Sequence, residues 1–326
     1  MRKILLFVPT LLLTFYSCNI VGPKGDNNVV FDLESKIYTV DTDGANLRLL
    51  ANGSNFVYSQ TKGIIIYIDN KTVHSMNYDG TNNHVILTAE NYISDLKFNS
   101  SGTKICISYD NNDKCVMNTD GSGFAFVNFR YGSGNIFSWS ISPLGDKIVL
   151  ISEEGLFLID QDGNNIKCLR ETSGKTYFRL VSFPSDENKI LYDEFNYMNN
   201  HVNLRLYNLA DSTDTILSRD APLYYEVTGS DTIILSGQGG TTLLDLKTVN
   251  NEFLPQMYDA HLSKDGKKIA CRGQDYSTIF LYDMKSGLKN SIFINLPGDR
   301  DITMPILTSD NKHIIFQINS VFEYYK

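Results

Sequence analysis

The chain has 326 residues and a formal net charge of −8, with 42% hydrophobic and 20% charged residues. This acidic balance argues against nucleic acid and against anionic membrane surfaces as partners, because both would repel the protein. The length is sufficient for one large core or for one closed array of repeats.

The N-terminus has the pattern of a secretory signal. Arg2 and Lys3 precede an apolar run, ILLFVPTLLLTF (4–15), which is too short to span a bilayer, since that needs about 20 residues. The run ends in FYSC, so that Ser17 immediately precedes Cys18. This ending resembles a bacterial lipobox, in which the cysteine becomes the lipidated first residue of the mature chain. The alternative is an ordinary secretory signal that contains a cysteine.

We therefore predict a signal peptide over 1–17, a lipidated tether over 18–28 and one β domain over 29–326. The mature chain, 18–326, carries 27 basic and 37 acidic residues, a net charge of −10. The predicted location is the bacterial cell envelope, as an outer-membrane lipoprotein on either the periplasmic or the surface face. Its contact with the membrane is expected through the N-terminal lipid only.

A phrase built around Asp-Gly recurs along the chain. Clear copies are IYTVDTDGANLRLL (37–50), VHSMNYDGTNNHVIL (73–87), CVMNTDGSGFAFV (115–127) and LFLIDQDGNNIKCL (156–169). The Asp-Gly pairs lie 36, 41 and 42 residues apart, and weaker copies without Asp-Gly follow. A period near 40 residues with several short strands per unit is typical of propeller blades.

A second phrase, strand–turn–strand, alternates with the first, as in LKFNSSGTKICIS (96–108) and WSISPLGDKIVLI (139–151). Together the two phrases predict four antiparallel strands per unit, and no stretch has convincing helical periodicity. Eight third strands can be counted if IYTV and VFEYY are both included, which favours eight blades. Seven blades result if the two termini share a closing blade. The predicted fold is therefore all-β, a single β-propeller of seven or eight four-stranded blades.

These phrases, with Ser-Pro-x-Gly or Lys-Asp-Gly in the first turn and Asp-x-Asp-Gly-x-Asn in the second, resemble the WD40-like (PD40-type) repeats of TolB-like β-propellers. The resemblance covers nearly all of the mature chain. It implies the propeller fold, but such propellers serve as binding platforms, as enzymes and as parts of larger peptidases.

The acidic turns imitate the start of a calcium loop, as in DTDGAN (41–46). A complete loop of that kind needs a bidentate Glu at its twelfth position, where this chain has Asn52. We therefore assign the acids to capping of hairpin turns and predict no metal site and no cofactor. There is no G-x-S-x-G nucleophile motif and no catalytic residue is assigned.

Polar residues recur on the inner strands, on the face opposite the apolar set. We predict a polar ring at the mouth of the central channel, formed by Asp95, Lys97, Glu226, Asp259 and His261. The alternative is that these side chains pair with one another or with trapped water in a narrow channel. His261 is the only inner-strand histidine, whereas the propeller lyases of this kind use several, so a lyase function is disfavoured.

Besides Cys18, the mature chain has four cysteines, and two of them lie in KICISYDNNDKCVM (104–117). If the turn is centred on Asp110-Asn111, Cys106 and Cys115 face each other and an oxidising compartment would allow a disulfide. A turn shifted by one residue separates them as two buried free thiols.

The sequence favours a non-catalytic, monomeric binding or scaffolding module whose partner is an envelope protein or a glycan. The alternatives are an enzyme that uses the channel mouth, such as a polysaccharide lyase or glycan hydrolase, and a sensor of a small ligand. A binding module should present exposed aromatic residues on one rim of the ring.

Overall fold

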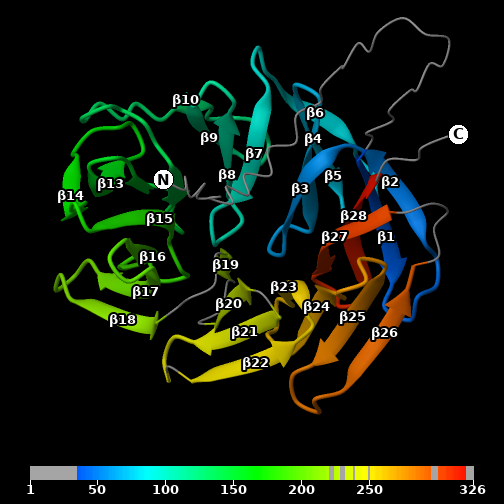
Figure 1. The fold of residues 1–326 in the computed structure, drawn as a ribbon. Helices are drawn as coiled ribbons and strands as arrows, with labels where there is room; N and C mark the ends of the chain where they lie inside the picture. The colour runs from blue at the N-terminus through cyan, green and yellow to red at the C-terminus, as the bar shows by residue number, and fades with distance from the viewer. Residues whose placement is uncertain are drawn as a thin grey trace, which may run out of the picture.

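The structure, a computed structural model, describes residues 35–219, 224–227, 232–237, 239–248, 250–294 and 300–320. These residues form seven four-stranded sheets around a central axis (Figure 1). The predicted all-β propeller is therefore confirmed with seven blades, and the alternative of eight is wrong. The signal peptide, Cys18, the tether and VFEYYK lie outside the described residues. No helix that could cross a membrane occurs within the described ranges.

Six blades are built from consecutive strands, ordered from the channel outward. Blade 1 contains β3 (Ser54–Ser59), β4 (Ile64–Asp69), β5 (Thr72–Asn77) and β6 (His84–Thr88). Blade 2 contains β7 (Ile93–Phe98), β8 (Lys104–Tyr109), β9 (Lys114–Asn118) and β10 (Ala125–Phe126). Blade 3 contains β11 (Ser138–Ile141), β12 (Lys147–Ile151), β13 (Gly155–Asp160) and β14 (Lys167–Glu171).

The next three blades follow the same order. Blade 4 contains β15 (Thr176–Ser182), β16 (Lys189–Asn196), β17 (His201–Asn208) and β18 (Asp214–Arg219). Blade 5 contains β19 (Tyr224–Val227), β20 (Thr232–Gly237), β21 (Gly240–Asp245) and β22 (Asn251–Pro255). Blade 6 contains β23 (Tyr258–Leu262), β24 (Lys268–Arg272), β25 (Thr278–Asp283) and β26 (Lys289–Phe293).

The seventh blade is shared by the two ends of the chain and closes the ring. Its inner strands are β27 (Arg300–Leu307) and β28 (His313–Ser320), and its outer strands are β1 (Ser35–Asp41) and β2 (Arg48–Asn52). The third strand of this closing blade is thus IYTV near the N-terminus, so one blade uses both termini. Antiparallel pairing of β1 with β28 places Ser35 opposite Asn319.

The hydrophobic core lies between the blades and not within any one of them. Seven clusters of buried side chains occupy the seven gaps between neighbouring blades. Within β8, Ile105 and Ile107 pack toward blade 1 while Cys106 packs toward blade 3. Because both faces of the second and third strands are largely buried, as in β12 and β13, these strands read as continuous apolar runs, and a lone blade could not be stable.

This alternation separates the two cysteines that the sequence brings near each other. Cys106 pairs with Val116, and Cys115 pairs with Ile107, so the two thiols lie on opposite faces of blade 2. Both are free and buried, and the suggested disulfide is contradicted. The turn is not centred on Asp110-Asn111 but is shifted toward the C-terminus, and within it the amide of Asn112 donates a hydrogen bond to the carbonyl of Tyr109. Burial raises the pKa of Cys106 to about 12 and that of Cys115 to about 11.

The Asp-Gly turns join the third and outer strands, and their acids cap the turns as predicted. In the four copies an Asp carboxylate oxygen accepts the amide N–H two residues later, at distances of 2.9–3.1 Å. The glycines have positive φ and lie against the outer part of the preceding blade. A Cβ on Gly121 would lie 2.6 Å from the carbonyl oxygen of Ile86, and one on Gly163 would lie 2.3 Å from that of Asn128.

Gly121 and Gly163 are therefore needed for two reasons, the backbone conformation and the contact with the neighbouring blade, whereas at Gly44 and Gly80 the positive φ is the main reason. This explains why the chain repeats Asp-Gly at nearly constant spacing.

The ring has two unlike faces. We call the face at which the inner strands begin the start face; it carries the turns between second and third strands and the connections between blades. We call the other the turn face; it carries the turns after the inner strands and the Asp-Gly turns. Both Ser35 and Ser320 lie on the start face, because β1 begins there and β28 ends there.

Candidate binding surfaces: the channel and the start face

Asp95 and Lys97 lie together on β7. Their side chains form an ion pair of 3.2 Å, and each is about half exposed, 45% and 53%. The Asp95 carboxylate raises the pKa of the Lys97 ammonium group. An ion pair this accessible to solvent contributes little to the stability of the fold. We therefore interpret it as a polar group that lines the channel.

Lys114 extends this polar group outward, and the sequence did not point to it. Asp95 pairs across the sheet with Ser108, and Ser108 pairs with Lys114, so all three occupy one face of blade 2. Lys114 is buried and donates to the side-chain oxygen of Asn112 at 3.2 Å. Burial lowers the pKa of its ammonium group.

Asp259 and His261 lie on β23 in blade 6. A β-bulge in this strand interrupts the regular alternation of side chains between the two faces of the sheet. The register with β24 shifts between Tyr258 and His261, and Asp259 within the bulge has a φ of 47°. The Asp259 carboxylate accepts a hydrogen bond of 2.8 Å from Nε of Arg272. Asp259 is therefore held by the neighbouring strand, and His261 is buried opposite Ala270.

Arg272 is the residue that organises this part of blade 6. Its guanidinium lies 4.1 Å from the ring centre of Tyr276 and 5.4 Å from that of Tyr258. It also donates to the carbonyl of Gly273. Tyr276 has a φ of 58°, a conformation that is rare for a bulky residue, so the arginine holds a strained aromatic residue at the rim.

The predicted ring thus resolves into separate groups. Asp95 and Lys97 belong to blade 2, whereas Asp259 and His261 belong to blade 6, with blade 1 and the closing blade between them. Glu226 lies on β19, opposite Ile234, and its side chain is outside the described residues. Two of the carboxylates that a catalytic channel mouth would use, Asp95 and Asp259, are each engaged in an ion pair.

In blade 3, the polar residues at the positions that correspond to Asp95 and Lys97 form hydrogen bonds with the backbone of blade 4. Ser138 Oγ accepts the amide of Val181, and Ser140 Oγ accepts the amide of Phe183. These bonds satisfy backbone donors at the inner edge of β15, which no further strand covers. Polar residues in this register therefore serve the joint between blades in at least one place.

Hydrogen bonds between turns constrict the channel at the turn face. Asn99 Nδ2 donates to the carbonyls of Ser142 and Pro143 in blade 3. Ser100 Oγ donates to the carbonyl of Pro184 in blade 4 at 3.1 Å. Because that last bond bypasses blade 3, the turns of blades 2 and 4 converge near the axis.

The start face carries exposed aromatic side chains from several blades. Each residue lies either just before an inner strand or in a turn between second and third strands. They are Tyr92 (51% exposed), Phe137 (58%), Tyr197 (61%) and Tyr276 (47%). The turns that follow the inner strands lie on the turn face. Among the described residues of these turns, Leu144 is the one large apolar side chain that is exposed.

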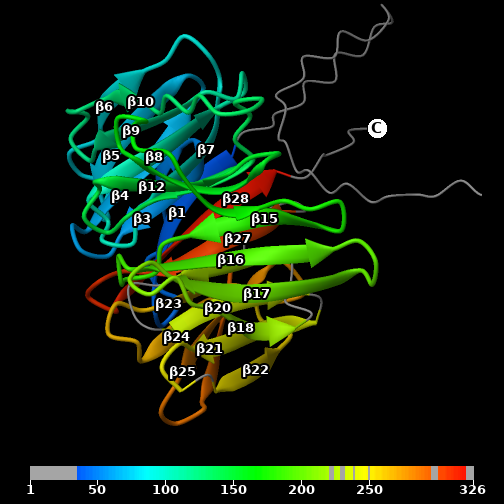
Figure 2. The ribbon, with the colours of Figure 1, turned by 90° about the vertical axis from the view of Figure 1, so that its left-hand side faces the viewer.

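The β16–β17 hairpin of blade 4 projects furthest from the start face (Figure 2). It has eight residue pairs, from Lys189–Asn208 to Asn196–His201, against five in blades 3 and 6. Compared with those two blades, three additional pairs extend it by about 10 Å; blades 1 and 5 have six pairs each. Its turn presents Tyr197 and Met198, of which Met198 is 75% exposed.

Below this turn is a rigid aromatic platform. The rings of Tyr177, Phe195 and Tyr197 lie 4.8–5.6 Å apart, centre to centre. The Arg179 guanidinium lies 5.7 Å from the ring centre of Phe195. The amide of Tyr197 donates to the carbonyl of Lys175. The platform is therefore fixed in advance of any contact with a partner.

Arg179 is fixed in turn by a buried acid. Asp193 is 1% exposed and accepts two hydrogen bonds from the Arg179 guanidinium, at 2.6 and 3.0 Å. It also accepts the amides of Arg179 and Leu180, which lie in a bulge of β15. Burial raises the pKa of the Asp193 carboxyl, and the guanidinium and amide donors oppose that rise.

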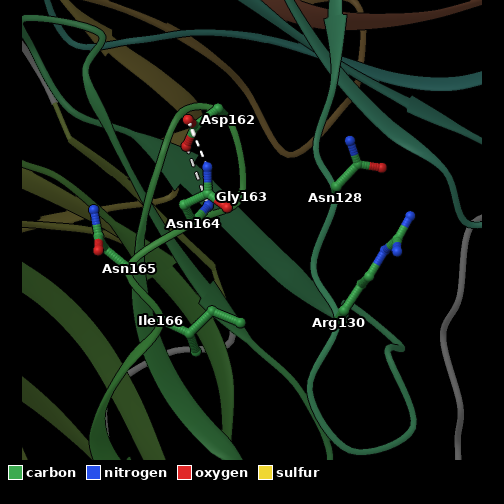
Figure 3. Close-up of a pocket in the computed structure, with 7 residues that line it drawn as sticks. All are labelled: Asn128, Arg130, Asp162, Gly163, Asn164, Asn165 and Ile166. Carbon is green, nitrogen blue, oxygen red and sulfur yellow. Dashed lines mark hydrogen bonds between the residues drawn. The ribbon is translucent and has the colours of Figure 1, made fainter.

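A hollow at the outer rim, between blades 2 and 3, is shown in Figure 3. Its walls are Asn128, Arg130 and the Asp-Gly turn Asp162–Ile166. The Asp162 carboxylate accepts the amide and the side-chain nitrogen of Asn164 (Figure 3). The acid that would bind a ligand is thus occupied by its own turn, and we assign no site here.

Sequence reasoning missed the aromatic residues of the start face. They lie outside both repeating phrases, in the segments NYISD (91–95), NIFSW (135–139), NYMNN (196–200) and QDYST (274–278). For the three tyrosines, an aromatic residue next to polar residues was the available signal; Phe137 lies beside Ile136 and near Trp139 and gave no such signal.

The geometry defines the class of the protein as a seven-bladed β-propeller. No protein-family model matches the chain, and no curated protein matches it. Among solved structures, 1584 chains match. One is a chain in the crystal structure of a nidogen/laminin complex, with 12% identity and a TM-score of 0.50 over 80% of this chain and 94% of that one. At this identity the likeness concerns the fold alone.

Proposed function

We propose that this protein is a lipid-anchored β-propeller of the bacterial cell envelope that binds an envelope protein or a glycan through its start face. The observation that carries the proposal is the set of exposed aromatic residues on that face, Tyr92, Phe137, Tyr197 and Tyr276. Exposed aromatic side chains supply large contact areas at low entropic cost and are enriched at binding surfaces.

Two further observations support the proposal. The lipobox-like sequence before Cys18 supports export and anchoring, and the repeated phrases support kinship with TolB-like propellers. The similar solved chain occurs in a nidogen/laminin complex, so a propeller of this shape is compatible with a protein-binding role.

The test uses photo-crosslinking in the cells that naturally produce the protein. A crosslinking amino acid replaces Phe137 on the start face or, as a matched control, Leu144 on the turn face; both side chains are exposed, 58% and 71%. We expect a discrete adduct, to protein or to polysaccharide, from position 137 and none from position 144. Adducts from position 144 alone, or from neither position, would contradict the proposal.

A further inference from the structure

The projecting hairpin of blade 4 lies on the same face as the two ends of the described chain. Figure 2 shows β16 and β28 running toward the side on which the β16–β17 turn projects. Ser35, where the described chain begins, pairs with Asn319 at that face. An anchor attached upstream of Ser35 would therefore be connected to the ring at the start face.

The length of chain upstream limits how far that face can lie from a membrane. Sixteen residues separate Cys18 from Ser35. A chain of that length spans at most about 55 Å. A lipid on Cys18 would thus hold Ser35, and with it the edge of the start face, within about 55 Å of the bilayer surface.

The hairpin and the anchor are on opposite sides of the ring. The closing blade, which contains Ser35, and blade 4 face each other across the channel (Figure 1). A tether at the closing blade alone would leave the ring free to tilt. A second contact at blade 4 would hold the start face parallel to the membrane.

The chemistry of the hairpin turn suits the headgroup region of a bilayer. Tyr197 and Met198 are the exposed large side chains of the turn. Of the nearby charges, Arg179 pairs with Asp193 and Arg205 with Glu194, and Lys175 is exposed. Tyrosine favours this interface because its ring is apolar and its hydroxyl remains hydrated. Acids elsewhere on the face, such as Asp110, Asp113 and Glu153, are exposed and would keep the other loops in water.

From these observations we propose that the tip of the β16–β17 hairpin, Tyr197 and Met198, is a membrane-contacting foot that inserts into the lipid headgroup region. This inference rests on the proposed lipid anchor, and it adds a second membrane contact where the sequence alone led us to expect contact through the lipid only. The extra length of the hairpin, about 10 Å, leaves Tyr92, Phe137 and Tyr276 above the headgroups. They are then accessible to a partner that lies close to the membrane.

The test places an environment-sensitive fluorophore on the lipidated full-length chain. Cys168 is exposed, whereas Cys106, Cys115 and Cys271 are buried, so Cys168→Ser provides a background without a reactive surface thiol. Met198→Cys carries the label at the hairpin tip. Leu144→Cys is the matched control on the turn face, since the two native side chains are 75% and 71% exposed.

The labelled proteins are reconstituted into phosphatidylcholine vesicles, and flotation with the vesicles reports anchoring. We expect emission at position 198 to rise roughly three-fold or more and to be quenched by nitroxide-bearing lipid, with no change at position 144. Flotation without shielding at position 198 would overturn the hairpin contact and leave the anchor standing. Failure to float would overturn both.

A third measurement tests whether another part of the chain, and not the membrane, shields the label at position 198. In the unlipidated Cys18→Ser chain without vesicles, the label at position 198 should emit as it does in water. Shielding there would mean that a segment of this chain or a second copy occupies the tip, and it would overturn the proposal.

Discussion

The two faces of the ring differ in how closely their loops follow the sequence repeat. On the turn face, buried residues such as Asn99, Ser142 and Thr308 accept amide hydrogen bonds from the turns that follow the inner strands. On the start face, the corresponding segments range from the tight turn between Asp69 and Thr72 to the long connection over 127–137.

The difference follows from packing. An Asp-Gly turn on the turn face contacts the neighbouring blade, as Gly163 contacts Asn128 and Gly121 contacts Ile86, so the residues of these turns are constrained. The connectors of the start face differ widely in length from blade to blade. Binding residues are expected on variable loops held by a rigid scaffold, which agrees with the aromatic residues found there.

The largest effect is expected where the start face depends on a buried charge. Asp193→Ala leaves the Arg179 guanidinium and two bulge amides without their acceptor, and should lower the free energy of unfolding by about 3–5 kcal/mol. Chemical denaturation measures the change. Asp211→Ala, which removes an exposed turn cap in the same blade, is the control, and equal losses for the two variants would refute this account.

On the turn face, Gly163→Ala combines backbone strain with steric overlap. Gly163 has a φ of 83°, and its Cβ would meet the Asn128 carbonyl, so we expect a loss of about 2–4 kcal/mol. Gly266→Ala has positive φ without overlap, and Gly174→Ala has neither. Their losses should decrease in that order, and three similar midpoints would show that contact between blades does not constrain the turn.

A smaller, pH-dependent effect is expected from the acids of the turn face. Hydrogen bonds from the turns lower the pKa values of Asp79, Asp120 and Asp162. A carboxylate with a lowered folded-state pKa contributes stability above its unfolded-state pKa, near 4, and loses it as the pH falls through the folded-state value. The difference in Tm between wild type and Asp162→Ala should therefore be constant near neutral pH and shrink in acid; a constant difference throughout would contradict it.

The smallest effect on stability is expected from the aromatic residues of the start face. Phe137→Ser and Tyr276→Ser remove exposed side chains, and Phe137→Ser should change the free energy of unfolding by no more than about 0.5 kcal/mol. Tyr276→Ser should cost slightly more, because the ring stacks on Arg272. Denaturation midpoints check both values. A loss at Phe137 as large as that at Gly163 would remove the contrast between the faces.

Much of the fold could be predicted from the sequence. The spacing of Asp-Gly pairs indicated the blades, and the acids cap their turns because a hairpin with positive φ needs those residue types. The candidate site was less accessible. Asp259 lies in a bulge and pairs with Arg272, and no alternating pattern predicts a bulge. Asp95 and Lys97 keep the predicted register, but a register does not indicate which groups meet across the ring.

By itself, the sequence determined the local chemistry of this protein: strand, turn, strand, and the residues that each turn requires. These depend on neighbours within a few residues, so they can be read in order. Only the tertiary structure decided that the ring closes with seven blades, because closure pairs Ser35 with Asn319. It likewise separated Cys106 from Cys115 and placed Tyr197 on a projecting hairpin, since register and the packing between blades depend on residues that are distant in the chain.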